Sequence, residues 1–231
     1  MMPVASQSAP ESSALKTCIE VYRQQAQTEP IEKVWKRFRA STCGKSWIDA
    51  LKSAYGHRCL YCDHAESHSI DHRDAKSATV DRAFAWSNFR PSCGDCNRLK
   101  STLAIVDPLS EDPRDFIEYD LTTGKPTPIT TPARQTKAKA TSRLLDHQTL
   151  NDARRAKRQR VLNALVRFLA DEAGHDEARV IEELAVEEPH RAIVRDLVLG
   201  AEADLHQWSP LVRQAMRKLP VLKTWTLNPA A

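Results

Sequence analysis

The chain has 231 residues, 41% of them hydrophobic and 28% charged, a balance typical of a globular protein with one or two domains. Its net charge of +4 is too small to indicate nucleic-acid binding by itself. Because the sequence contains neither a run of 18 apolar residues nor a basic patch followed by an apolar run at its start, we expect a cytoplasmic protein with no membrane partner.

Apolar residues follow helical spacing over residues 13–40, and Pro30 marks the expected start of a second helix. Ser46 is a candidate N-cap for the next helix, which should stop at Gly56. The periodicity then fades over residues 57–102, where cysteines become frequent. A compact, loop-rich segment of this kind needs an external staple to be stable.

The stretch from residue 107 to 129 predicts a loop and then a short hairpin around a Thr-Gly-Lys turn, and helical spacing dominates after Pro132. The sequence thus divides into a helical segment over 1–45, a core over 46–130 and a helical region over 131–231. The expected fold class is α+β, with a small core embedded in a mostly α-helical chain.

Charge is unevenly distributed in the helical region. Residues 134–160 contain nine basic residues against two acidic ones, whereas residues 171–204 contain eleven acidic residues against three basic ones. The basic stretch could face phosphates and the acidic stretch could not, but both could equally be solvated helix faces.

Four of the six cysteines form two C-x-x-C knuckles with 30 residues between them: Cys59-Leu-Tyr-Cys62 and Cys93-Gly-Asp-Cys96. Zn²⁺ takes four tetrahedral ligands, and each knuckle delivers two thiolates. Since cysteines fill all four positions, no site stays open for water. The sequence therefore predicts a structural zinc site.

Two alternatives explain the cysteines differently: a thioredoxin-like redox pair, or unrelated free thiols. A redox site requires one C-x-x-C motif after a strand and not two, which favours zinc. His57, His64 and His68 lie nearby and could replace a ligand, although four cysteines suffice. Cys18 and Cys43 have no partner in the pattern, and we interpret them as isolated thiols in a cytoplasmic protein.

The knuckles enclose an Asp71-His72 pair and Asn88, and Asn97 follows the second knuckle directly. This order resembles the HNH (His-Me finger) nucleases. The resemblance implies a ββα-metal core in which two strands and a helix hold one catalytic metal, beside a separate four-cysteine zinc staple. It makes His72 the general base, Asp71 and Asn97 ligands of Mg²⁺ or Mn²⁺, and Asn88 the residue that ties the intervening loop and orients the imidazole.

The chemistry of these residue types supports the same roles. Imidazole has an unperturbed pKa near 6.5 and can accept a proton from water at cellular pH. Carboxylate and amide oxygens are hard ligands suited to Mg²⁺, so this site and a soft four-cysteine site would not exchange metals.

A narrower resemblance covers residues 46–160. It rests on SWIDALKSAYGHRCLYC, DHRDAK, AWSNFRPSCGDCNRLKS and FIEYDLTTGKPTPI, which are similar to the PtuB-type nucleases of bacterial Septu antiphage systems. The resemblance implies an effector that works with an ATPase of the ABC/SMC-like kind. The acidic C-terminal helices are the candidate docking surface for that partner.

Basic residues surround the expected catalytic centre and would hold phosphates without reading bases: Arg73, Lys76, Arg90, Arg98 and Lys100. Arg98 and Lys100 are expected at the start of the helix after Cys96, where backbone N–H groups also favour anions. Double-stranded DNA is the preferred substrate, and RNA stays open. The competing interpretation is a non-catalytic four-cysteine zinc module that binds nucleic acid or a protein partner.

Overall fold

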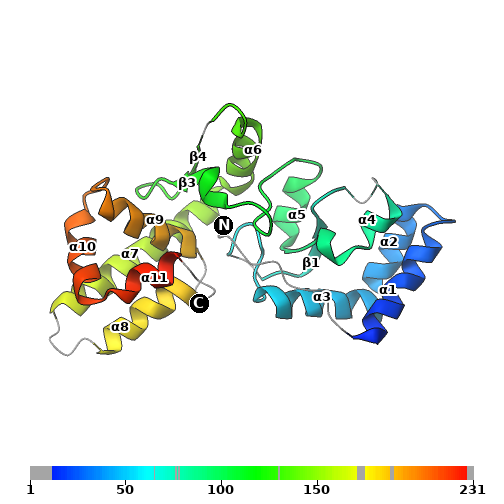
Figure 1. Ribbon diagram of the computed structural model, residues 1–231, viewed down its shortest axis with the longest axis horizontal. Helices are drawn as coiled ribbons and strands as arrows, with labels where there is room; N and C mark the ends of the chain where they lie inside the picture. Colours follow the sequence, from blue (N-terminus) through cyan, green and yellow to red (C-terminus); the bar gives the residue numbers. More distant parts are fainter. Residues whose placement is uncertain are drawn as a thin grey trace. The chain divides into compact units, whose positions relative to one another are not determined.

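A computed structural model describes residues 12–64, 66–75, 77, 79–129, 131–170, 175–187 and 190–227 (Figure 1). These residues are mostly helical and also form two small antiparallel sheets, so the mixed helix and strand content expected from the sequence is confirmed. No helix among them is long and apolar enough to cross a membrane.

The described chain forms two compact units. The N-terminal unit contains residues 12–61 and 66–103, and the C-terminal unit contains residues 62–64 and 104–227. The first helices are thus grouped with the cysteine-rich segment, and the hairpin is grouped with the C-terminal helices. This grouping differs from the three predicted regions because the early helices pack their apolar faces on the first sheet.

The N-terminal unit places three helices before its small sheet. Its elements are α1 (Ser13–Gln25), α2 (Ile31–Ala40), α3 (Thr42–Tyr55), β1 (Ser69–His72), α4 (Val80–Ala83), the 3-10 turn η1 (Trp86–Asn88), β2 (Phe89–Ser92) and α5 (Gly94–Lys100). β1 and β2 are antiparallel, and their register pairs Ser69 with Ser92 and His72 with Phe89.

The expected start of α2 after Pro30 and the stop of α3 at Gly56 are confirmed, the latter in a left-handed conformation with φ of 81°. The prediction that Ser46 caps α3 is wrong. Ser41 is the N-cap and accepts the backbone N–H of Gly44 at 3.1 Å, so the helix begins at Thr42. Glycine is needed here because a Cβ at position 44 would lie 2.1 Å from the carbonyl oxygen of Phe38.

Aromatic side chains fill the core of the N-terminal unit. Trp35 and Phe38 of α2, Trp47 of α3, Phe84 and Phe89 are all buried. The rings of Trp35 and Phe38 lie 4.9 Å apart, and those of Trp47 and Phe89 lie 5.9 Å apart edge to face. These contacts fix the three helices against the sheet.

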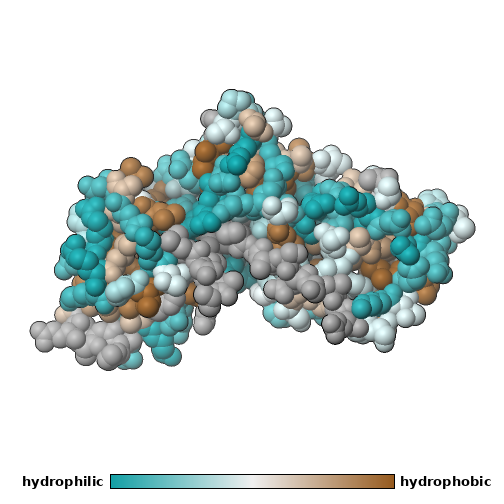
Figure 2. Space-filling view, in the orientation of Figure 1, coloured by the Kyte–Doolittle hydropathy of each residue, from teal (hydrophilic) through white to brown (hydrophobic). Residues whose placement is uncertain are grey.

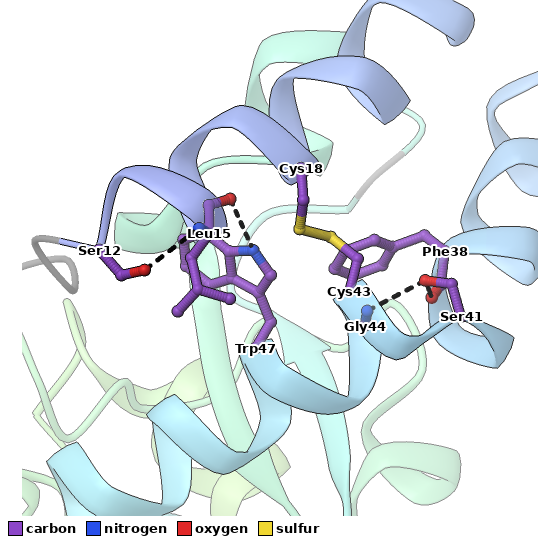
Figure 3. The surroundings of a disulfide bond; sticks show 8 residues. All are labelled: Ser12, Leu15, Cys18, Phe38, Ser41, Cys43, Gly44 and Trp47. Atoms are coloured by element: carbon purple, nitrogen blue, oxygen red, sulfur yellow. Dashed lines mark hydrogen bonds between the residues drawn. A yellow bond between two sulfur atoms is a disulfide. The ribbon is translucent and has the colours of Figure 1, made fainter.

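A disulfide joins α1 to α3 through Cys18 and Cys43, whose Cα atoms are 6.0 Å apart (Figure 3). The interpretation of these residues as isolated thiols is therefore wrong. Packing of α1 across α3 brings the two cysteines together, and the indole N–H of Trp47 also donates to the carbonyl oxygen of Leu15 at 3.3 Å. A separation of 25 residues along the chain gives no sign of this contact.

The C-terminal unit begins with a hairpin and continues as helices. Its elements are the 3-10 turn η2 (Pro113–Asp115), β3 (Ile117–Tyr119), β4 (Pro126–Pro128), α6 (Gln135–Leu145), α7 (Gln148–Ala170), α8 (His175–Glu182), the π-helical turn η3 (Glu183–Glu187), α9 (Arg191–Glu202), α10 (Ser209–Lys218) and α11 (Val221–Leu227). The predicted hairpin is confirmed. Its turn contains Gly124 at φ of 73°, where a Cβ would lie 2.4 Å from the carbonyl oxygen of Asn151.

Residues 62–64 pack against α9 in this unit: the rings of His64 and His190 stack 4.9 Å apart, and the Asp63 carboxylate pairs with Arg191 at 3.4 Å.

Hydrophilic residues dominate the face of the molecule seen in Figure 2.

Part of the basic stretch over residues 134–160 is taken up by helix packing and by ion pairs within the C-terminal unit. Arg154 and Lys157 are buried, and Arg154 donates to the carbonyl oxygens of Gly124 and Leu145. Other cations pair with carboxylates: Arg134 with Asp115, Lys137 with Glu111, and Arg155 with Asp152. Helix packing and ion pairs therefore account for much of this positive charge.

Candidate metal centre and catalytic cleft

The four knuckle cysteines converge and are all buried. Cys93 directly follows β2 and caps α5, where its Sγ accepts the backbone N–H of Cys96 at 3.4 Å. The first knuckle is held beside β2 because the backbone N–H of Leu60 donates to the carbonyl oxygen of Pro91 at 2.9 Å. One ligand atom from each cysteine lies within 4.8 Å of the other three.

This four-cysteine cluster fits a tetrahedral metal such as zinc. With bonds of about 2.3 Å, a tetrahedral Zn²⁺ separates its sulfurs by about 3.8 Å, which lies inside the observed limit. Within the described residues it is also the one group of three or more His, Cys, Asp or Glu that could hold a metal. The neighbouring histidines are not needed; His68 Nε2 instead accepts the backbone N–H of Gly94 at 3.2 Å.

His72 ends β1 in a largely apolar environment. Its ring lies 4.5 Å from that of Trp35 and 5.5 Å from that of Phe89, both edge to face. Its Nε2 lies 2.9 Å from the carbonyl oxygen of Ala83, which can only accept. A neutral His72 therefore carries its proton on Nε2, and the lone pair is on Nδ1.

Asn88 closes the loop that follows β1. Its side-chain oxygen accepts the backbone N–H of Asp74 at 2.7 Å, and its nitrogen donates to the carbonyl oxygens of Asp74 at 3.0 Å and Arg82 at 2.9 Å. Its exposed fraction is 0%. The loop also contains Ala83, the partner of His72, so these bonds fix the carbonyl group that orients the imidazole.

Asp71 precedes His72 and is buried among donors. The Tyr61 hydroxyl donates to one of its oxygens at 2.5 Å, and the Lys100 ammonium lies 3.1 Å from the same carboxylate. Lys100 also donates to the carbonyl oxygen of His72 at 2.7 Å. The carboxylate is thus compensated by a buried cation from the end of α5.

Asn97 projects from α5 toward β1. Its side-chain nitrogen donates to the Ser69 hydroxyl at 3.2 Å and to the carbonyl oxygen of Ile70 at 3.4 Å. Both bonds use the amide nitrogen, so the amide oxygen is the atom that could coordinate a cation.

Three of the four predicted catalytic residues line one cleft of about 590 Å³: Asp71, His72 and Asn97. The fourth, Asn88, is buried and holds the loop after β1 through its hydrogen bonds. The cleft has three walls. β1 and the segment after it contribute Ile70, Asp71, His72, Ala75 and Ser77; α5 and its end contribute Asn97, Ser101 and Thr102; α2 contributes Glu32, Trp35, Lys36 and Arg39. The α2 wall was not predicted, although the three basic residues among the last five of that helix were a visible signal.

Two of the predicted phosphate-binding residues, Arg90 and Lys100, are buried, whereas Arg98 is exposed and pairs with Asp95 at 3.3 Å. Arg90 is 3% exposed and donates to the carbonyl oxygens of Ser87 and Phe89, and Lys100 is 5% exposed. Arg98 and Lys100 lie in the last turn of α5 and not at its start, because the helix has only seven residues after its Cys93 cap. That placement prediction is therefore wrong.

Arg73 lies at the surface and binds Asp74 at 2.9 Å. This hydrogen bond lowers the pKa of the Asp74 carboxyl. Lys76 lies outside the described residues.

No protein-family model, curated protein or solved structure matches the chain.

Proposed function

We propose that the chain is an HNH-type nuclease that uses a divalent metal to hydrolyse phosphodiester bonds, with DNA as the first substrate. One observation carries the proposal: Asp71, His72 and Asn97 line a single cleft, with the His72 lone pair on Nδ1. A base, a carboxylate and an amide oxygen in one cleft are the groups that metal-assisted hydrolysis requires.

In this mechanism His72 Nδ1 takes a proton from the attacking water. The water oxygen forms a bond to phosphorus while the bond from phosphorus to the leaving oxygen breaks, and solvent returns a proton to that oxygen. Asn88 acts as a positioning residue because it fixes the loop that carries the Ala83 carbonyl. Trp35 and Phe89 pack against the imidazole and limit its rotation.

Asp71 and Asn97 offer the hard oxygen atoms that Mg²⁺ or Mn²⁺ prefers. When bound, such an ion would neutralise the charge that develops on the phosphate and the leaving oxygen. It would have to share the Asp71 carboxylate with Lys100 or displace that ammonium, which lies 3.1 Å away.

The ion pair between Asp71 and Lys100 favours a second candidate function, in which a four-cysteine zinc module binds nucleic acid without cutting it. A carboxylate that already accepts hydrogen bonds from Tyr61 and Lys100 is satisfied without a metal. Asp71 would then be a structural residue of the unit.

Cleavage of supercoiled plasmid with Mg²⁺ or Mn²⁺ tests the two functions. We expect nicking by the wild type and by His147→Ala, a control histidine outside the cleft. His72→Ala should lose at least 100-fold in rate, the usual contribution of a general base being about 10²–10⁴. Its zinc content should stay unchanged.

A wild type that cuts neither DNA nor RNA with either metal, yet binds them, would replace the nuclease by the binding module. If His72→Ala cuts as fast as the wild type, His72 is not the general base.

The partnership with an ABC/SMC-like ATPase and a role in antiphage defence rest on the PtuB resemblance. Much of the acidic stretch proposed for docking already forms ion pairs within the C-terminal unit, as in Glu177–Arg167, Asp196–Arg195 and Glu202–Lys223. Co-expression with the ATPase and co-purification test the partnership, and two proteins that never co-elute would contradict it.

A further inference from the structure

Helix α2 has two different faces. Its apolar face buries Val34, Trp35 and Phe38 in the core of the N-terminal unit. A flank of the same helix lines the cleft through the exposed side chains of Lys36 and Arg39. Because the ring of Trp35 packs on His72, this flank is held beside the proposed base by the adjacent residue.

The cations of α2 also differ in their partners. Arg37 binds the Glu29 carboxylate at 2.7 Å, and Lys33 lies 3.9 Å from the same carboxylate. By contrast, neither Lys36 nor Arg39 has a carboxylate oxygen within 4.0 Å among the residues that the structure describes. The two cations that line the cleft are thus the uncompensated ones.

Helix stability explains one of these residues only in part. A cation in the last turn, such as Arg39, interacts favourably with the helix dipole. Lys36 lies in the middle of α2, where this effect is absent. Residues three apart on a helix are neighbours, about 5–6 Å between Cβ atoms, so Lys36 and Arg39 form one local positive patch.

We propose that Lys36 and Arg39 bind the phosphate backbone of a nucleic-acid strand and hold it against the cleft. This inference deepens the proposed nuclease function, since it adds two exposed cations to a centre at which the predicted Arg90 and Lys100 are buried. Flexible, exposed cations contact backbone phosphates without reading bases, so binding should be independent of sequence. Glu32 lines the cleft one turn earlier, so the two cations stand in the C-terminal half of α2.

A matched pair of variants tests the proposal. Lys36→Gln/Arg39→Gln removes the two cleft cations, and Lys33→Gln/Arg37→Gln removes two cations of the same helix that pair with Glu29. Both double variants lower the net charge by two, so long-range attraction falls equally. Any difference in binding between them therefore reports local phosphate contacts.

Binding of a labelled 20-base-pair duplex of mixed sequence would be measured by fluorescence anisotropy at several salt concentrations, without added Mg²⁺ or Mn²⁺. The plot of log K against log salt should flatten by about 1.8 for the cleft variant, because each phosphate contact contributes about 0.9. The control should keep nearly the wild-type slope. Equal slopes for the two variants would overturn the proposal.

Three further measurements sharpen the result. Unchanged zinc content and helical circular dichroism in both variants exclude unfolding as the cause. Inorganic phosphate or a mononucleotide that competes as well as the duplex, phosphate for phosphate, would contradict a strand-binding surface. Repeating the titration on His72→Ala separates the two proposals, since binding through α2 does not require cutting.

Discussion

The Cys18–Cys43 disulfide closes a loop that contains all of α2, the helix that forms one wall of the cleft. Replacing both cysteines by serine should therefore destabilise the N-terminal unit, mainly because the unfolded chain gains conformational entropy when the cross-link is absent. For a closed loop of 25 residues, the chain-entropy relation gives about 12 cal/mol/K, or about 3.5 kcal/mol at 25 °C. Such a loss is a large fraction of the stability of a small domain.

Urea unfolding followed by tryptophan fluorescence would measure this loss, because Trp35 and Trp47 are buried in the same unit. We expect the oxidised wild type to be about 3.5 kcal/mol more stable than Cys18→Ser/Cys43→Ser. A reductant should bring the wild type close to the variant and leave the variant unchanged. Identical curves for the oxidised wild type and the variant, with no response to reductant, would refute the reasoning.

Three other perturbations have definite expected outcomes. Stripping the metal with a strong chelator should unfold the cysteine-rich segment as seen by circular dichroism, since structural zinc contributes about 10 kcal/mol, and Zn²⁺ but not Mg²⁺ should restore it. Asn88→Ala should cost about 3 kcal/mol in urea unfolding and lower kcat more than KM, because it leaves buried backbone groups of Asp74 and Arg82 without partners; a stability within about 0.5 kcal/mol of wild type would contradict this. Burial lowers the pKa of His190 to about 3, so the neutral form is favoured in the folded state; the stabilisation is complete above pH 6.5 and declines as the pH falls toward 3, and an acid-unfolding curve of His190→Gln that matches the wild type would argue against it.

Local signals in the sequence were sufficient for some features. The spacing of the C-x-x-C motifs predicts the four-cysteine cluster, because each knuckle needs only a tight turn to deliver two thiolates. Gly56 and the turn at Gly124 were recognisable because both positions require a positive φ. Such features depend on a few neighbouring residues.

Features that depend on tertiary packing were not predictable in this way. The Cys18–Cys43 pair forms only because α1 crosses α3, and the α2 wall exists because Trp35 packs on His72. Burial of Arg154 was also invisible, since the carbonyl oxygens that receive its guanidinium come from residues 124 and 145. A basic residue in a sequence gives no sign of acceptors assembled by the fold.

The three hydrogen bonds of Asn88 have a practical consequence for engineering. They join Asp74 and Arg82 at the base of the loop, so a change of length between Asp74 and the Thr79 cap of α4 should leave the strand that carries His72 in place. Ala75 and Ser77 of this segment line the cleft. A peptide inserted in this loop should therefore alter access to the cleft. The lining residues on α2 and α5 would stay where they are.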